Sequence, residues 1–202
     1  MKVLFGIIAK ILTLFIYPKN KRKTMRHILK SNLVTRWYGR QIFKTAKSIG
    51  EGFYCGGFSV VSRHTIIKNH VSFNGMFING GGNVTIGNYF HSGIECMIIT
   101  QNHKYDDGEL LPYGTKYNYK DVVIEDCVWL GRRVTILPGT HIGEGAIIQA
   151  GAVVHGEIPP YAIAGGNPAK VFKYRDIEHY KKLKKEGRFY TGLSYCKAKF
   201  GE

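Results

Sequence analysis

VVIEDCVWLGRRVTILPGTHIGEGAIIQAGAVVHGEI, residues 122–158, repeats an apolar side chain at every sixth position. The repeating residues are Ile124, Leu130, Ile136, Ile142, Ile148 and Val154. Four positions after each comes a second small or β-branched residue, and this set consists of Val128, Val134, Thr140, Ala146, Ala152 and Ile158. A helix would repeat its apolar face about every 3.6 residues and a flat strand every two. A period of six therefore predicts an all-β solenoid, in which each short strand supplies inward residues and then turns a corner.

A noisier series with the same period precedes this stretch and consists of Val60, Ile66, Ser72, Ile78, Val84, Phe90 and Cys96. The interval from Cys96 to Val128 is five sixes plus two further positions, so the register breaks between the two series. The segment 101–120 is rich in Asn, Asp, Gly and Tyr, and we expect it to be a loop extruded from the solenoid. Three sixes make one triangular coil, and the two series together predict roughly four to five coils.

The net charge of +15 belongs to the two ends of the chain. Residues 1–50 contain 12 Lys and Arg and no Asp or Glu, residues 51–169 contain 7 basic and 10 acidic residues, and residues 170–202 contain 10 and 4. Basic ends indicate anionic partners such as a membrane surface, phosphorylated substrates or nucleic acid. We expect no nucleic-acid binding, because no recognisable motif is present and the basic residues are not grouped on one identifiable face.

The run 3–17 is apolar apart from one lysine and one threonine, and the basic cluster 19–23 follows it. It is shorter than the roughly 20 residues that span a membrane, and no cleavage site of a signal peptide follows it. Two interpretations stay open. Residues 1–23 could lie peripherally on the inner face of the cytoplasmic membrane, or they could form a helix that packs on the solenoid or on a neighbouring subunit.

We expect three parts: a basic, apolar N-terminal helical segment at 1–50, the solenoid domain at 51–171 with its loop at 101–120, and a basic C-terminal helix with a tail at 172–202. The two prolines after Ile158 end the regular repeat, and residues 161–171 are expected to form a last partial coil. The four cysteines show no C-x-x-C spacing and no histidine ligand pattern, so we expect neither a metal site nor a disulfide framework. Such cysteines suit the reduced cytoplasm.

Several ordered blocks carry a resemblance to a known family: Val128–Gly131, Ile136–Gly139, Ile142–Ala146, Ala150–Val154, Ile158–Tyr161 and Ala164–Lys170. Over about Val60 to Lys173 the sequence resembles the hexapeptide-repeat acyltransferases, and within them the galactoside, maltose, xenobiotic and polysaccharide O-acetyltransferases. The resemblance implies a left-handed parallel β-helix, a homotrimer and acetyl-CoA as cosubstrate, with no metal. The period alone gives none of these.

His103 differs from the other seven histidines because it lies where the register breaks. In the resembled family, a histidine about sixteen residues after an Ile-Gly step opens the loop and acts as the base, and Gly87 to His103 is that interval. An alcohol is a weak nucleophile, and histidine accepts a proton near neutral pH. We therefore expect His103 to be the catalytic general base. Many relatives have proline next, where this chain has Lys104, so the loop conformation and acceptor are open.

Polar residues near this loop are candidates for acceptor binding: Asn74, Tyr105 and Asp106. For Asn74, a corner residue that caps a turn is an equally good interpretation. The resemblance implies coenzyme contacts at Arg132, Ala150 and the step from His155 to Gly156, and contacts with the nucleotide end at Lys170 and Lys173. Trp129 either lines the coenzyme groove or is an ordinary buried aromatic. Lysines suit the phosphates of coenzyme A.

The sequence thus predicts an acetyl-CoA-dependent O-acetyltransferase that acts on a sugar hydroxyl, in the biosynthesis of surface polysaccharide or lipopolysaccharide. The apolar and basic N-terminus motivates the glycan, because lipid-linked acceptors are made at the inner face of the membrane. Three alternatives stay open: N-acetylation of a nucleotide-linked amino sugar, acetylation of a small molecule or antibiotic, and a non-enzymatic solenoid scaffold.

Overall fold

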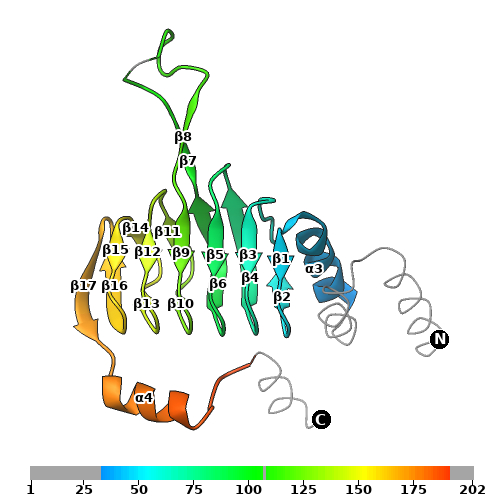
Figure 1. The fold of residues 1–202 in the computed structure, drawn as a ribbon, viewed down its shortest axis with the longest axis vertical. Helices are drawn as coiled ribbons and strands as arrows, with labels where there is room; N and C mark the ends of the chain where they lie inside the picture. Colours follow the sequence, from blue (N-terminus) through cyan, green and yellow to red (C-terminus); the bar gives the residue numbers. More distant parts are fainter. Residues whose placement is uncertain (1–32, 107, 192–202) are drawn as a thin grey trace, which may run out of the picture.

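The computed structural model describes residues 33–106 and 108–191, and within them the chain forms a left-handed parallel β-helix (Figure 1). One sheet of six strands contains β1 (Ser48–Ile49), β3 (Thr65–Ile67), β5 (Val84–Ile86), β9 (Val122–Ile124), β12 (His141–Ile142) and β15 (Glu157–Ile158). The second sheet wraps around a corner and contains β2 (Tyr54–Gly57), β4 (Ser72–Asn79), β6 (His91–Ile99), β10 (Trp129–Leu130), β11 (Thr135–Ile136), β13 (Ile147–Ile148), β14 (Val153–Val154), β16 (Ala162–Gly166) and β17 (Ala169–Tyr174). All pairs are parallel except β16 with β17 and the two strands of a small separate hairpin.

The strand pairs define three faces of a prism. The first face is the six-stranded sheet. On the second face, β10 pairs with β13 and with the first residues of β6. On the third face, β11 pairs with β14 and with the last residues of β6. We name the edges between faces by a residue or element on them: the Asp126 corner joins the first and second faces, the Arg132 corner joins the second and third, and the hairpin corner joins the third and first.

The six-residue period is confirmed over 122–158. All twelve residues of the two predicted sets are buried, with at most 3% of any of them exposed. Trp129 and Ile147 are register partners, as are Thr135 and Val153, so each coil takes three of the sixes. The one polar member of the buried sets, Thr140, is satisfied because its hydroxyl donates to the Leu137 carbonyl at 2.7 Å.

The corners add a second signal with the same period. Backbone φ is positive at Cys127, Arg133, Gly139, Gly145 and Gly151, which are six residues apart. Left-handed backbone costs free energy for residues with a side chain, so glycine suits three of these positions. At Gly145 the reason is also spatial, because an added Cβ would lie 2.9 Å from the Tyr180 ring.

The prediction for the first coils was wrong by one residue at two positions. Val60 is 45% exposed, and Ile66 is the outward residue between two buried neighbours on β3. Val61 and Ile67 point inward in their place. Alternate residues of a strand face opposite sides, so a shift of one residue exchanges inside for outside. The first face has six rungs because the solenoid begins at Ser48, and the estimate of four to five coils was therefore too low.

Two helices flank the solenoid in the described part of the chain, one at its N-terminal end and one along an edge (Figure 1). The helix α3 (Leu33–Thr45) covers the N-terminal coil with buried Ile42 and Phe43, and Ala46, directly after the helix, is buried as well. At the other end the parallel coil stops at Gly166, whereas a partial coil was expected up to residue 171. The chain instead reverses into antiparallel β17, and α4 (Ile177–Lys185) follows, with Asp176 as its N-cap.

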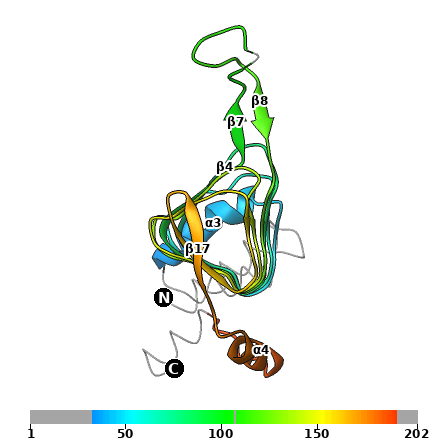
Figure 2. The same cartoon turned by 90° about the vertical axis from the view of Figure 1, so that its left-hand side faces the viewer.

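The extruded loop and the C-terminal helix, both expected from the sequence, project from opposite edges of the prism in the two ribbon views (Figures 1 and 2). The apolar run 3–17 and the basic cluster 19–23 lie outside the described residues. Among the helices of 33–106 and 108–191, none has the length and apolar composition needed to cross a membrane.

Candidate active site

The extruded loop is an antiparallel hairpin of β7 (Gln101–His103) and β8 (Tyr117–Tyr119). Its base is a backbone ladder that continues from the coil, in which the Lys120 amide donates to the Thr100 carbonyl at 3.0 Å. Val84 pairs with Val122 across the insertion, so the rungs before and after the hairpin remain neighbours. The insertion therefore leaves the solenoid intact and places its own residues outside it.

His103 is the last residue of β7 and is half-buried. Its Nδ1 lies 3.3 Å from the carbonyl oxygen of Gly114, on the opposite arm of the hairpin. A carbonyl oxygen only accepts hydrogen bonds, so this contact requires the hydrogen on Nδ1. In the neutral ring Nε2 then carries the lone pair, which is the form that a general base needs.

Tyrosine rings lie against the imidazole. Tyr113 stacks on His103 with 3.8 Å between ring centroids and an interplanar angle of 24°, and Tyr117 lies at 4.2 Å and 40°. Tyr119 continues the series at 6.1 Å from Tyr117. The end of the series nearest the solenoid contacts Gly81, where an added Cβ would come within 2.5 Å of the Tyr119 ring. Sequence reasoning did not assign these tyrosines a role.

The Arg132 corner brings four of the predicted residues into one column along the solenoid. Asn74 pairs with Ile94 of the next coil, and Arg132 lies at the same corner one coil further on. The Arg132 carbonyl accepts the amide hydrogen of Gly151, directly after Ala150, at 2.8 Å. Lys170 pairs with Gly165 one coil further on. Arg132, Ala150 and Lys170 are exposed, as coenzyme contacts require.

The other predicted coenzyme residues are distributed around this column. Lys173 is exposed on β17. Trp129 stands on the second face with 53% of its surface exposed, so the alternative of an ordinary buried aromatic is wrong. His155 and Gly156, in contrast, lie on the hairpin corner: the Gly156 carbonyl accepts from the His141 amide, where β12 of the first face begins.

The candidate acceptor residues also fall in two places. Tyr105 and Asp106 are exposed just beyond His103 on the hairpin. Asn74 is half-buried, and its amide nitrogen donates to the Ser92 carbonyl at 2.9 Å. This bond links neighbouring coils, which is the contact expected of a corner residue with a structural role.

A hollow of about 370 Å³ lies beside Trp129 on the second face and is closed on its other side by the C-terminal segment. Phe189 stacks on Tyr89 at 4.1 Å, and His91 Nε2 lies 3.4 Å from the Tyr190 carbonyl oxygen. Burial lowers the pKa of His91. The neutral ring therefore predominates at neutral pH, and Nε2 donates to that carbonyl.

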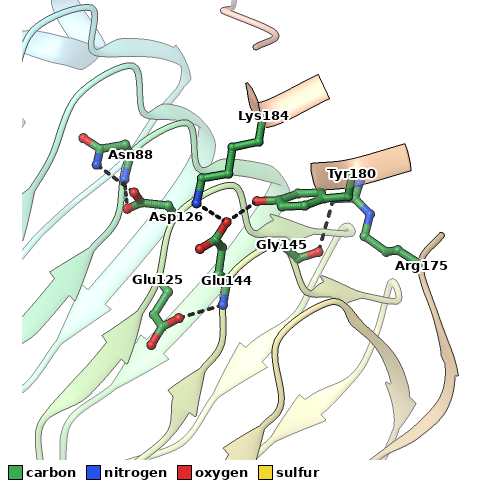
Figure 3. Close-up of polar contacts among 8 residues, drawn as sticks. All are labelled: Asn88, Glu125, Asp126, Glu144, Gly145, Arg175, Tyr180 and Lys184. Atoms are coloured by element: carbon green, nitrogen blue, oxygen red, sulfur yellow. Dashed lines mark hydrogen bonds and ion pairs between the residues drawn. The ribbon is translucent and has the colours of Figure 1, made fainter. Parts of the chain in front are cut away.

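Helix α4 is held on the Asp126 corner by polar side chains (Figure 3). The Glu144 carboxylate accepts hydrogen bonds from the Tyr180 hydroxyl at 2.9 Å and from the Lys184 ammonium. Arg175 donates to the Gly145 carbonyl at 3.2 Å and lies 5.3 Å from the centroid of the Tyr180 ring. The sequence carries no signal for these contacts, because the partners are 30 to 40 residues apart and belong to no motif.

The contacts of α4 shift the pKa values of the groups that make them. The hydrogen bond to Glu144 raises the pKa of Lys184, and burial raises the pKa of Tyr180. Burial also raises the pKa of the Cys127 thiol, which lies beside Tyr180. Cys55, Cys96 and Cys127 are free thiols, and no cluster of three metal ligands occurs among the described residues.

Residues 121–156 match the family model described as "Bacterial transferase hexapeptide (six repeats)". The chain is 35% identical over 106 residues to the galactoside O-acetyltransferase of Lactococcus lactis, which covers 50% of each chain. The fold is similar to that of a hexapeptide-repeat acetyltransferase from Vibrio cholerae, at 26% identity, a TM-score of 0.53 and coverage of 86% of this chain and 92% of that one. It is also similar to the fold of a galactoside acetyltransferase in complex with coenzyme A, at 23% identity, a TM-score of 0.58 and coverage of 88% and 83%.

The resemblance to the hexapeptide-repeat acetyltransferases is thereby confirmed, in the repeat, in the sequence and in the fold. The chain spans about half the length of the curated relatives that it matches.

Proposed function

We propose that the protein is an acetyl-CoA-dependent O-acetyltransferase and that His103 is its general base. The observation that carries this proposal is the contact of His103 Nδ1 with the Gly114 carbonyl, which leaves the Nε2 lone pair to accept a proton. Its family supports the proposal, since relatives of similar sequence and fold are named as acetyltransferases.

The reaction requires two proton transfers at His103, one to the imidazole and one from it. Nε2 takes the proton of a sugar hydroxyl as the oxygen attacks the thioester carbonyl of acetyl-CoA, and a tetrahedral oxyanion forms. When this intermediate collapses, the C–S bond breaks, and the imidazolium returns the proton to the leaving thiolate. The acetyl group passes directly to the acceptor, so no serine or cysteine nucleophile is needed.

The coenzyme is assigned to the Arg132 corner, with the exposed residues Arg132 and Ala150 along its arm and Lys170 and Lys173 towards its nucleotide. Lysines bind phosphate as point charges. Trp129 borders the same face. The coenzyme A complex of the galactoside acetyltransferase of similar fold supports coenzyme A as the ligand.

The positions of these residues favour a homotrimer with sites between copies. His103 emerges at the hairpin corner, whereas the coenzyme column follows the Arg132 corner. The third face lies between the two corners, and its width of about five extended residues corresponds to roughly 16 Å. A base must come within hydrogen-bond distance of its substrate. The hairpin of one copy therefore meets the Arg132 corner of the next, and His155 and Gly156 face the coenzyme from the hairpin side.

The acceptor that we propose is a sugar of a surface polysaccharide or lipopolysaccharide. The galactoside O-acetyltransferase relative supports a sugar hydroxyl as the acceptor. The net charge of +12 on residues 1–50 supports a reaction at the anionic inner face of the cytoplasmic membrane. Tyr105 and Asp106, exposed next to His103, are the side chains that would contact the acceptor, with Asn74 from the Arg132 corner.

The test is release of coenzyme A from acetyl-CoA by the purified chain, measured with a thiol reagent across a panel of sugars, amino sugars and nucleotide-linked amino sugars. We expect turnover with a sugar, and a product that hydroxylamine cleaves, as it cleaves esters and not amides. His103→Ala should lower kcat by about 10²–10⁴-fold while trimer and coenzyme binding persist. No turnover with any acceptor, or an unchanged rate in His103→Ala, would overturn the proposal.

A further inference from the structure

The imidazole of His103 is held on three sides. Tyr113 covers one ring face at 3.8 Å, Tyr117 lies against the ring at 4.2 Å, and the Gly114 carbonyl takes the Nδ1 edge at 3.3 Å. The three groups come from the returning half of the hairpin, and His103 comes from the outgoing half. The antiparallel pairing of His103 with Tyr117 sets this arrangement.

This arrangement restricts both side-chain torsions of the histidine. The hydrogen bond alone fixes one edge and still allows the ring to tilt about it. Two aromatic rings at stacking distance remove that freedom, since tilting would bring the imidazole into one ring and away from the other. The edge that carries Nε2 is then the part of the ring presented to an acceptor.

We propose that Tyr113 and Tyr117 are positioning residues of the proposed acetyl transfer, and that they hold His103 in the orientation and tautomer of a base. This inference rests on the proposed role of His103. In this inference the aromatic ring of each tyrosine acts on His103, and the phenol hydroxyl has no role.

Charge adds to the positioning. When Nε2 accepts the proton of the hydroxyl, the imidazole becomes a cation, and the negative face of an aromatic ring attracts a cation within about 6 Å of its centroid. The two rings therefore favour the state in which the proton has been transferred over the state before transfer. An interaction that strengthens in the transition state raises kcat and leaves substrate binding unchanged.

A purely structural role explains the arrangement less well. Tyr113 and Tyr117 remain 46% and 37% exposed, so the rings close no apolar core. Tyr119 extends the ring series towards Gly81 in the neighbouring coil, where an added Cβ would meet its ring at 2.5 Å. The ring series thus fixes the position of the imidazole relative to the solenoid.

The experiment compares Tyr113→Phe with Tyr113→Leu, and Tyr117→Phe with Tyr117→Leu. The Phe variants keep the ring and should retain kcat within about twofold. The Leu variants lose it and should lower kcat by about 10–100-fold with little change in KM for acetyl-CoA, since a small misplacement of a reacting group costs up to that much. Tyr174→Leu, at a half-exposed tyrosine on β17, is the matched control and should behave as the unsubstituted protein.

A second measurement needs no turnover. The ¹⁵N spectrum of the His103 ring reports which nitrogen carries the hydrogen, and it should show Nδ1–H in the unsubstituted protein and in both Phe variants. The Leu variants should show a mixture that includes Nε2–H. This result separates the inference from the proposed function, because the ring signals are read even if no acceptor is turned over.

Two results would overturn the inference. If Tyr113→Phe and Tyr117→Phe lose as much activity as the Leu variants, the hydroxyl acts and the ring does not. If the Leu variants keep kcat and the Nδ1–H form, the rings do not position His103. Circular dichroism and coenzyme binding check each variant for folding, and a Leu variant that unfolds at one position leaves the other to decide.

Discussion

The hairpin β7–β8 and the helix α4 both leave the solenoid, and they are attached to it in different ways. The hairpin continues the backbone ladder of its own coil and carries a series of stacked rings. α4 has no buried residue and is held by side chains, through Glu144 above all (Figure 3). A ladder fixed by adjacent rungs keeps a reacting group in place, whereas α4 depends on a few side-chain contacts with one corner of the solenoid.

The first and largest effect concerns the hairpin. Removal of residues 101–120 joins Thr100 to Asp121, and Val84 and Val122 are then separated by three sixes, as register partners are in the regular coils. We expect a folded solenoid of nearly unchanged melting temperature and complete loss of acetyl transfer. Calorimetry and the coenzyme A release assay measure the two effects. An unfolded product would show that the hairpin supports the coil.

The hairpin also tests the proposed assembly. Ala150→Trp places a bulky side chain on the exposed Arg132 corner, where it would obstruct the coenzyme. We expect this variant and His103→Ala each to be inactive. Co-expressed in equal amounts, they should regain about a quarter of full activity, because one site in four of a random trimer combines an intact hairpin with an intact neighbouring corner. Activity of the mixture no greater than that of either variant would place the base and the Arg132 corner of one site in the same copy.

Some of this arrangement could be predicted from the sequence. The inward residues of 122–158 follow from the period, because every coil buries the same positions, and the place of the hairpin follows from the break in that period. Val60 and Ile66 were placed wrongly, because in a short irregular coil an alternating strand gives two nearly equal choices of side. The ring contacts of His103 depend on hairpin register, and the bond from Glu144 to Lys184 joins distant segments, so neither leaves a repeating pattern.

The attachment of α4 should respond to loss of one carboxylate. Glu144→Ala removes the acceptor of both Tyr180 and Lys184, so we expect the helix to open more often and expose Cys127. Alkylation of Cys127 by iodoacetamide, followed by mass spectrometry of its peptide, should speed up several-fold. The control Glu178→Ala removes an exposed carboxylate on α4 that pairs with Lys181 of the same helix, and it should leave the rate unchanged. Equal rates in Glu144→Ala and the control would show that other contacts hold the helix.

The smallest effect is a pH dependence of the same attachment. Glu144 raises the pKa of Lys184 in the folded protein, so its contribution is fully present below the unfolded lysine value of about 10.4 and is lost as pH rises through the higher folded value. The raised pKa of Tyr180 keeps its hydroxyl protonated in this range, so the change belongs to Lys184. The ratio of Cys127 alkylation rates between Glu144→Ala and the unsubstituted protein should therefore fall above about pH 10. Lys184→Arg stays charged at higher pH, and in that background the ratio should persist. A ratio that falls equally in both backgrounds would assign the pH dependence to a group other than Lys184.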